Sequence, residues 1–241
     1  MNRGIYAAAS GMTSMEQWMD VTANNLANVS TTGFKRDTLA FNDTLEQQLA
    51  ANSGQGKPIG SVGYGPAAAG QYTSFEAGSI NQTGRSLDVA LNDPNTMFSV
   101  ATPGGTRYTR DGAFQISQAG QLVNNSGDAV LDSSGQPITL SPNAKIKIDP
   151  TGAITADDKV VGTLGIYTGS FIKEGQNLYT SSNAAPSTGA TVTPGALEGS
   201  NVNAVSSMVE LITLNRQFEL AQKSIQQQDD LSQRLIQSLN Q

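Results

Sequence analysis

The N-terminal part of the chain carries apolar residues at alternating intervals of three and four positions. Seven of the eight positions in this row are apolar, and Thr22 is the exception. Such spacing places the row on one side of an α-helix and is typical of helices that pack against another helix. Gly33 suits the left-handed conformation that ends many helices, so we expect the helix to end there. The row consists of Ile5, Ala8, Met12, Met15, Met19, Thr22, Leu26 and Val29.

The C-terminal part, from about Val202, returns to the same spacing. Seven of the nine positions in its row are apolar, and Asn201 or Asn203 is expected to cap the helix. Other apolar residues lie off the row, which predicts a second buried face and more than one neighbour. The row consists of Leu211, Leu214, Phe218, Ala221, Ile225, Gln228, Ser232, Leu235 and Leu239. The residues off the row are Val209, Ile212, Leu231 and Ile236.

The segment between these helices has a different composition. Of the 25 glycines, 22 lie between Gly54 and Gly199, and all nine prolines lie between Pro58 and Pro194. Leu87, Val89 and Leu91 alternate with other residues as in a half-buried strand, and Gly-containing turns separate the short strands expected further on. The expected strands include 107–110, 113–116, 121–124, 128–131, 145–149 and 160–167.

The sequence therefore predicts an α+β fold. The N- and C-terminal helices pair as an antiparallel coiled-coil-like domain, and a Gly-rich antiparallel β domain is inserted between them. The predicted division places residues 1–35 with 200–241 in a helical assembly domain and residues 36–80 with 169–199 in an extended or β connector. Residues 81–168 form the β domain, of sandwich or barrel type.

Composition excludes several functions. The chain of 241 residues has a net charge of −6, and its lysines and arginines are scattered, which argues against a nucleic-acid partner. It has no Cys and no His, so disulfides, thiolate chemistry and Ser-His or Cys-His catalysis are excluded. No apolar run reaches the roughly 20 residues that span a bilayer. The start of the chain does not follow the pattern of a cleaved signal peptide.

Carboxylates in the central segment are the remaining candidates for catalysis. A glycosidase needs two of them facing one bond. Most of these aspartates stand beside Gly or Pro, where Asp is an ordinary turn residue. No calcium-binding loop or phosphate-binding Gly loop with its Lys is present. We therefore expect no catalytic residue, no metal site and no cofactor.

Three asparagines, Asn24, Asn25 and Asn28, stand at the end of the N-terminal helix, where Asn is a poor helix former. One interpretation is that the helix frays here and the amides cap it. The alternative is that they bond the backbone of adjacent subunits.

The motif at the end of this helix resembles a known family. Asn24-Asn25-Leu26-Ala27-Asn28, then Ser30 and Gly33-Phe34-Lys35, is similar to the N-terminal signature of the rod, hook and hook-associated proteins of the bacterial flagellum. Segments 83–91 and 108–114 look like the paired central motifs of rod and hook subunits. Segment 197–203 resembles the C-terminal signature of rod proteins, and the run 216–219 is more like the proximal-rod than the distal-rod type.

The resemblance implies a structural subunit of the flagellar rod, most like the proximal rod. Such a subunit assembles with copies of itself and with other rod proteins into a tubular shaft that carries torque to the hook. It lies in the periplasmic part of the basal body and leaves the cytoplasm through the flagellar export apparatus without signal cleavage. Phe41 and Leu45 are similar to the short element that engages the export gate. The alternatives are a distal-rod or other hook-basal-body paralogue, and a secreted carbohydrate-active β-domain protein.

The predicted assembly interface follows the two helical rows and the asparagines. It comprises Met12, Met15, Met19, Asn24, Asn25, Leu26, Asn28, Leu211, Leu214, Phe218, Ile225, Leu235 and Leu239.

Overall fold

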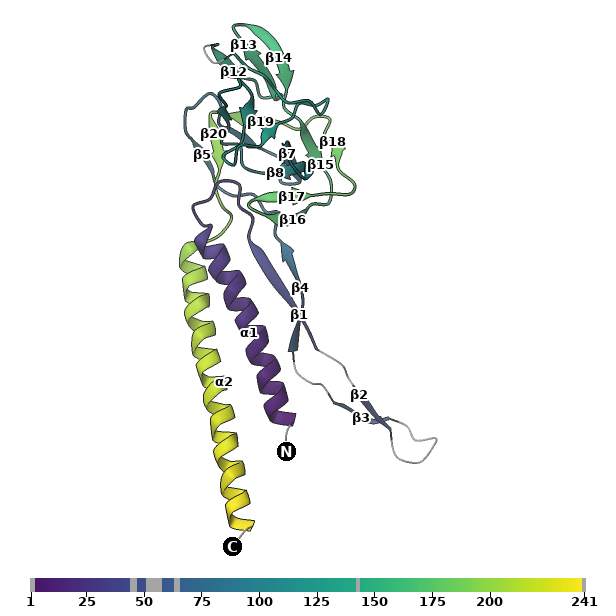
Figure 1. Ribbon diagram of the computed structural model, residues 1–241, viewed down its shortest axis with the longest axis vertical. Coiled ribbons are helices and arrows are strands. Elements are labelled where there is room, and N and C mark those ends of the chain that lie inside the picture. The colour runs from purple at the N-terminus through teal and green to yellow at the C-terminus, as the bar shows by residue number, and fades with distance from the viewer. Residues whose placement is uncertain (1–2, 44–46, 51–57, 63–65, 142–143, 240–241) are drawn as a thin grey trace. The chain divides into compact units, whose positions relative to one another are not determined.

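The computed structural model describes residues 3–43, 47–50, 58–62, 66–141 and 144–239, and Figure 1 shows its elements. Within these ranges, the side chains of residues 3–7, 41–43, 47–50, 58–62, 66–69, 232, 235, 236 and 239 are not described. The chain divides into two compact units. Unit 1 comprises Met1–Leu26, Asp37–Tyr72 and Asn203–Gln241, and unit 2 comprises Ala27–Arg36 and Thr73–Val202. The α+β class predicted from the sequence is confirmed.

Two long helices dominate unit 1. Helix α1 spans Arg3–Ala27 and helix α2 spans Ala204–Leu239. They lie side by side and run in opposite directions (Figure 1). At 1.5 Å per residue, 36 residues make α2 about 54 Å long. Asn203 caps α2, because its Oδ1 accepts a hydrogen bond from the amide of Ser206 at 3.0 Å.

Unit 1 also contains paired strands from the segment 37–72. Strand β1 pairs with β4, and β2 pairs antiparallel with β3. Strands β3 and β4 therefore lie in the segment 36–80, for which the sequence predicts an extended or β connector. The four strands are β1 (Asp37–Asp43), β2 (Gln47–Ala50), β3 (Pro58–Val62) and β4 (Pro66–Thr73).

Unit 2 is built of short antiparallel strands. Nine of them form its largest sheet, in the order β16-β17-β8-β7-β11-β10-β9, with β15 also paired to β7 and β18 to β15. Strands β12, β13 and β14 form a second sheet, while β19 pairs with β6 and β20 with β5. The strands in chain order are β5 (Ile80–Gln82), β6 (Val89–Leu91), β7 (Thr96–Thr102), β8 (Gly105–Thr109), β9 (Gln115–Ile116), β10 (Leu122–Val123), β11 (Ala129–Val130), β12 (Ile146–Ile148), β13 (Ala153–Ala156), β14 (Lys159–Thr163), β15 (Ile166–Thr168), β16 (Ile172–Gly175), β17 (Leu178–Thr180), β18 (Ala185–Pro186), β19 (Val192–Pro194) and β20 (Ala196–Glu198).

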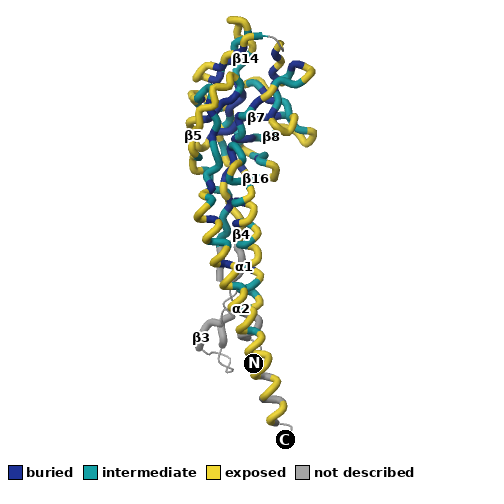
Figure 2. Tube along the Cα trace, turned by 90° about the vertical axis from the view of Figure 1, so that its left-hand side faces the viewer, coloured by how far each residue is buried: buried dark blue, intermediate teal, exposed yellow. Residues whose placement is uncertain are grey.

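The core of unit 2 forms around β7. Five consecutive residues of this strand, 96–100, are buried, so both of its faces are covered. Phe98 and Val100 pack into the main apolar cluster, which includes Val192 of β19. Met97 packs against Phe171 and Tyr179 in a second cluster. The dark blue segments of Figure 2 gather in this unit.

Two boundaries of the β region differ from the expectation. The single strand expected at 160–167 is two strands, β14 and β15, in different sheets. The chain turns at Gly165, where a Cβ atom would lie 2.6 Å from the carbonyl oxygen of Asp132, so only glycine fits. The predicted β domain ends at residue 168, but unit 2 continues through β16–β20 to Val202. The late strands complete both apolar clusters.

Candidate assembly surfaces and a buried ionic centre

One side of α2 faces α1. Trp18 of α1 donates its indole N–H to Glu210 of α2, with 3.0 Å between Nε1 and Oε1. Leu214 lies one helical turn beyond Glu210 and is only 3% exposed. Leu211, Phe218 and Ile225 follow the same side and are half-buried, as are Met12, Met15, Met19 and Leu26 of α1. The predicted row of α2 is therefore the more buried side of this helix within the subunit itself.

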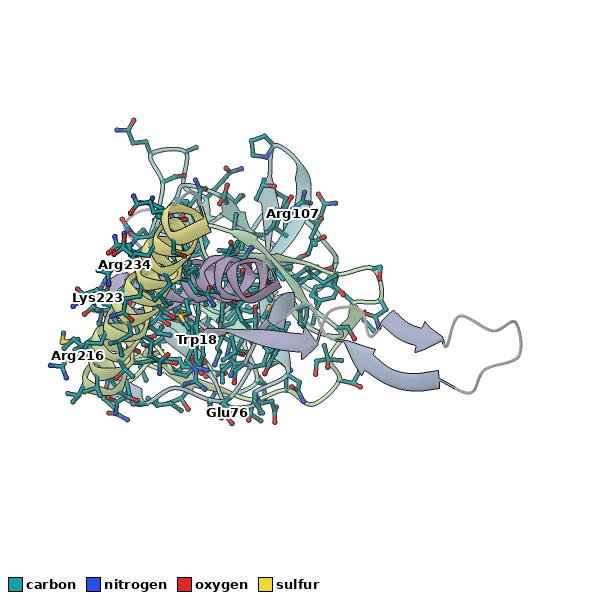
Figure 3. All side chains as sticks on the ribbon, turned by 90° about the horizontal axis from the view of Figure 1, so that it is seen from below. Trp18, Glu76, Arg107, Arg216, Lys223 and Arg234 are labelled. Carbon is teal, nitrogen blue, oxygen red and sulfur yellow. The ribbon has the colours of Figure 1, made fainter. Side chains whose placement is uncertain are left out.

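Several apolar residues that lie off this row are exposed. Four of them form an apolar stripe on the first turns of α2, at spacings of three and four. The stripe consists of Val205, Met208, Val209 and Ile212, with exposed fractions of 71, 50, 59 and 53%. Further along the same side come the exposed basic residues Arg216, Lys223 and Arg234 (Figure 3). Large apolar side chains grouped on a surface mark an interaction site more often than scattered ones do.

The three asparagines have different surroundings. Asn25 is buried, and its amide forms two hydrogen bonds with the backbone of Asp37, from Nδ2 to the carbonyl at 2.8 Å and from the Asp37 amide to Oδ1 at 2.9 Å. Its side chain thus ties α1 to the start of β1 in its own chain. Asn28 follows the last helical residue and accepts a hydrogen bond from the Thr31 hydroxyl. Asn24 is exposed.

Other predicted site residues cannot be placed in detail. Leu45 lies outside the described residues, and the side chains of Phe41, Leu235 and Leu239 are not described. Phe41 is in strand β1 and the two leucines are in the last part of α2.

Unit 2 contains a buried ionic centre that the sequence analysis did not single out. Glu198 lies between two cations. Its Oε1 accepts from Lys35 Nζ at 2.7 Å, and its Oε2 accepts from Arg110 Nε at 2.5 Å. The side chains of Lys35 and Arg110 are 0% exposed and that of Glu198 is 1% exposed. One buried anion therefore serves two buried cations.

Backbone groups satisfy the rest of the ionic centre. The amide of Gly78 donates to Glu198 Oε1 at 2.9 Å, and Lys35 Nζ donates to the carbonyl of Glu76 at 2.7 Å. Arg110 donates to three carbonyls, those of Leu91 at the end of β6, Asp93 between the strands and Thr96 at the start of β7. Buried charges are tolerated when they are paired and hydrogen-bonded in this way.

The pKa values of the pair reflect this environment. For Glu198, burial is the largest single influence and acts to raise the pKa. The charge of Arg110 and the hydrogen bonds from Lys35, Gly78 and Arg110 outweigh it, so the pKa of the carboxyl lies below its ordinary value. For Lys35, burial dominates and lowers the pKa despite the contact with Glu198, and the nearby charge of Arg110 acts in the same direction.

Gly33 sets how closely the N-terminal segment approaches β8. Its φ is +67°, and a Cβ atom would lie 2.5 Å from the carbonyl carbon of Arg110. The expected left-handed glycine is therefore present. It lies beyond the end of the helix at Ala27, where it brings the backbone of Lys35 alongside the ionic centre.

Sequence reasoning missed this centre because its members are far apart in the chain. Lys35 and Glu198 are separated by 163 positions, and Arg110 and Glu198 by 88. No local spacing connects them. Each of the three does lie in one of the motifs that suggested the family, and that coincidence was the available signal.

The described part of the chain contains neither a membrane-spanning helix nor a metal-binding group. No helix there combines the length and hydrophobicity that crossing a membrane requires. No group of three or more Asp or Glu side chains is placed to hold a metal ion among those residues.

The fold is that of an α+β protein with two units, one containing the two long terminal helices and the other a β-rich unit with its own core. Three segments match protein families. Residues 5–35 match the family described as flagella basal body rod protein, and 93–156 match the flagellar hook protein FlgE/F/G D1 domain. Residues 193–238 match the flagellar basal body rod FlgEFG protein C-terminal family.

Whole-chain relatives agree with these matches. The flagellar basal-body rod protein FlgF of Rhizobium meliloti (strain 1021) is 34% identical over 91% of this chain and 90% of that protein. FlgF of Caulobacter vibrioides (strain ATCC 19089 / CIP 103742 / CB 15) is 33% identical over 99% of this chain and 98% of that protein. The rod protein FlgG of Bacillus subtilis (strain 168) is 32% identical over 98% of both chains.

The chain belongs to the family of flagellar basal-body rod proteins and is a structural subunit of the flagellar rod. The resemblance inferred from its motifs is thus confirmed. Each of the three matched segments contributes one member of the ionic centre, namely Lys35, Arg110 and Glu198.

Proposed function

We propose that this chain is a proximal-rod subunit that polymerises with itself and with other axial proteins through its terminal helices. Contacts that repeat without closing a ring build an open helical filament, as a shaft requires. We further propose that the rows of α1 and α2 interlock as a coiled-coil-like pair. In this proposal the pair forms within the subunit, and the remaining exposed side of α2 meets the neighbouring subunit.

The observation that carries the proposal is the apolar stripe on α2. Met208 and Ile212 lie four residues apart and are about half exposed in the subunit. Burying a fully exposed apolar side chain of this size contributes roughly 1.5–3 kcal/mol, so burying the exposed half contributes about half as much. Because the gain recurs in every copy, four such residues per subunit supply a large driving force for assembly. The predicted row adds less to that interface, since it is already the more buried side of α2.

A substitution in the stripe tests this. Met208→Ser with Ile212→Ser should leave a soluble subunit with both units folded but without the ability to join a rod. The measurements are electron microscopy of basal bodies from cells that carry the variant, and sedimentation of the purified protein. Gln222→Ser with Gln226→Ser is the matched control at exposed polar positions of the same helix. Intact rods with the first variant would refute the stripe as the assembly surface.

The assignment to the proximal rod rests on the run 216–219 and on FlgF relatives, while FlgG relatives match about equally well. Counting the subunit in purified basal bodies, together with complementation of strains that lack either rod protein, separates the two. Rescue of only the distal-rod strain would move the assignment to the paralogue.

Export is a separate part of the proposal. We propose that the subunit passes the flagellar export apparatus into the periplasm with its N-terminus uncleaved, and that Phe41 and Leu45 engage the gate. Phe41→Ala with Leu45→Ala should retain the protein in the cytoplasm while unit 2 still folds. Normal secretion of this variant would mean that Phe41 and Leu45 have a packing role and do not engage the export gate. The intact mass of assembled subunits should show no processing beyond removal of the initiator Met.

We also propose that the chain has no enzymatic activity. The absence of His and Cys from the sequence and the structural role of the family support this. The pure protein should hydrolyse neither glycan nor peptide substrates. Hydrolysis that an Asp→Asn change in unit 2 abolishes would contradict the proposal.

A further inference from the structure

The chain passes between its two units at four points, and three of them lie within four residues of Lys35, Glu76 or Glu198 in the sequence. The crossings follow Leu26, Arg36, Tyr72 and Val202. The last three crossings are flanked on the unit 2 side by the segments 33–36, 74–78 and 198–201. We call these three segments together the collar.

The collar segments are bonded to one another. Gly33 N donates to Glu198 O at 2.8 Å, and Ser74 N donates to Arg36 O at 2.8 Å. Asn201 bridges all three segments, because its Oδ1 accepts from Arg36 N at 2.7 Å and its Nδ2 donates to the carbonyls of Ser74 and Glu76 at 3.0 and 3.1 Å. Lys35 and Glu198 add the ion pair within the same set.

Arg110 joins the collar to the core of unit 2. It donates to Glu198 and to three carbonyls, which belong to the end of β6, to the segment between the strands and to the start of β7. Five consecutive residues of β7 are buried, so these bonds link the collar, through one carboxylate and one guanidinium, to the buried centre of the main sheet.

We propose that Glu198, with Asn201, acts as a mechanical anchor that binds the segments entering and leaving unit 2 into one collar and transfers load from them to the sheet through Arg110. The transfer of torque in a rod rests on the proposed function. The anchoring itself does not, because it is a property of the isolated subunit. If the ionic centre only stabilised the core of unit 2, removing it would instead loosen the whole sheet.

Hydrogen exchange on the full-length subunit tests the proposal. In Glu198→Gln, the amides of Gly33, Arg36, Ser74 and Gly78 should exchange at least tenfold faster, while the amides of β7 and β8 change less than twofold. Glu174→Gln is the matched control, because it breaks the exposed ion pair with Arg107 elsewhere in the same unit. It should leave the collar amides unchanged.

Asn201→Ala provides a second variant without an unpaired buried charge. It removes three hydrogen bonds and should accelerate exchange at Arg36 and Ser74 in the same selective way. Asn92→Ala is its control, because Asn92 bridges Thr191 and Thr193 outside the collar. If Glu198→Gln does not fold, the result for Asn201→Ala alone decides whether the anchor proposal holds.

Selective opening of the collar supports the anchor. Equal acceleration in the collar and in β7–β8 would overturn it, as would unchanged protection of the collar. Neither result depends on rod assembly. The anchor can therefore be refuted while the stripe variant still blocks polymerisation, and it can be supported while the stripe variant still polymerises.

Discussion

Unit 2 and unit 1 differ in how far they bury their apolar side chains. Unit 2 encloses two apolar clusters and pairs its buried charges within itself. Unit 1 buries one side of α2 and leaves the stripe at Val205–Ile212 in solvent. The difference indicates that unit 2 can bury its core without a partner, and it is the reason we propose that unit 1 gains further neighbours in the filament.

The largest expected effect concerns how much of the chain unit 2 needs. A fragment of residues 81–168, the β domain suggested by sequence, should not fold. It lacks Glu198 opposite buried Arg110, and it lacks Val192, Phe171 and Tyr179 from the two clusters. A fragment of residues 27–202 should fold. Circular dichroism and dispersion of amide resonances compare the two fragments. A folded fragment 81–168 would mean that unit 2 does not need its late strands or Glu198 to fold.

A second change should weaken unit 1 alone. Phe218→Ala with Ile225→Ala removes two half-buried side chains from the row of α2 that faces α1. Full burial would make each cost about 2–5 kcal/mol, so we expect roughly 2–4 kcal/mol for the two. The ellipticity at 222 nm should fall at lower urea concentration while the unfolding of unit 2 stays in place. A shift of unit 2 would show that the two units are not independent in this respect.

A third, smaller effect tests the close approach at Gly33. Gly33→Ala forces a side chain into the left-handed region, at about 1–2 kcal/mol, and adds a clash with the backbone of Arg110. Unit 2 should lose stability in urea by more than the control Gly84→Ala, whose φ is +74° but whose Cβ meets no atom within 4 Å. Equal losses in both variants would mean that the clash is relieved at no cost.

The smallest effect has the opposite sign. Gly11 lies inside α1 with no atom within 4 Å of its ideal Cβ position. Gly11→Ala should therefore stabilise unit 1 by about 0.5–1 kcal/mol, because alanine loses less backbone entropy in a helix. The same helical signal in urea measures it. A loss of stability would place another element against Gly11.

Elements with a strong local signal were predictable from sequence. The spacing of the rows predicted both helices, although α1 ends at Ala27 and not at Gly33. The capping preference of Asn predicted that α2 starts at Asn201 or Asn203, and Asn203 is the cap. The Gly-containing turns separated most of the strands of unit 2. At the break between β14 and β15, prediction failed because an apolar run with one glycine carries no sign of which sheet each half joins.

The ionic centre and the partner of Asn25 were beyond local reasoning. The hydrogen bonds of Asn25 depend on where Asp37 returns after a turn, and the pairing of Lys35 with Glu198 depends on the closure of the whole unit. The sequence did predict that α2 has a second apolar side. Which of the two apolar sides of α2 stays exposed depends on the side against which α1 packs, and no local pattern shows that.

The contact between Trp18 and Glu210 makes the molecule its own optical reporter. Trp18 is the only tryptophan in the chain, it is half-buried in unit 1, and its indole N–H donates to a carboxylate on the opposite helix. Its fluorescence therefore responds to separation of α1 from α2 and to burial by a neighbouring subunit, with no tryptophan in unit 2 to obscure the signal. Emission wavelength and quencher accessibility can thus follow polymerisation in the unlabelled protein.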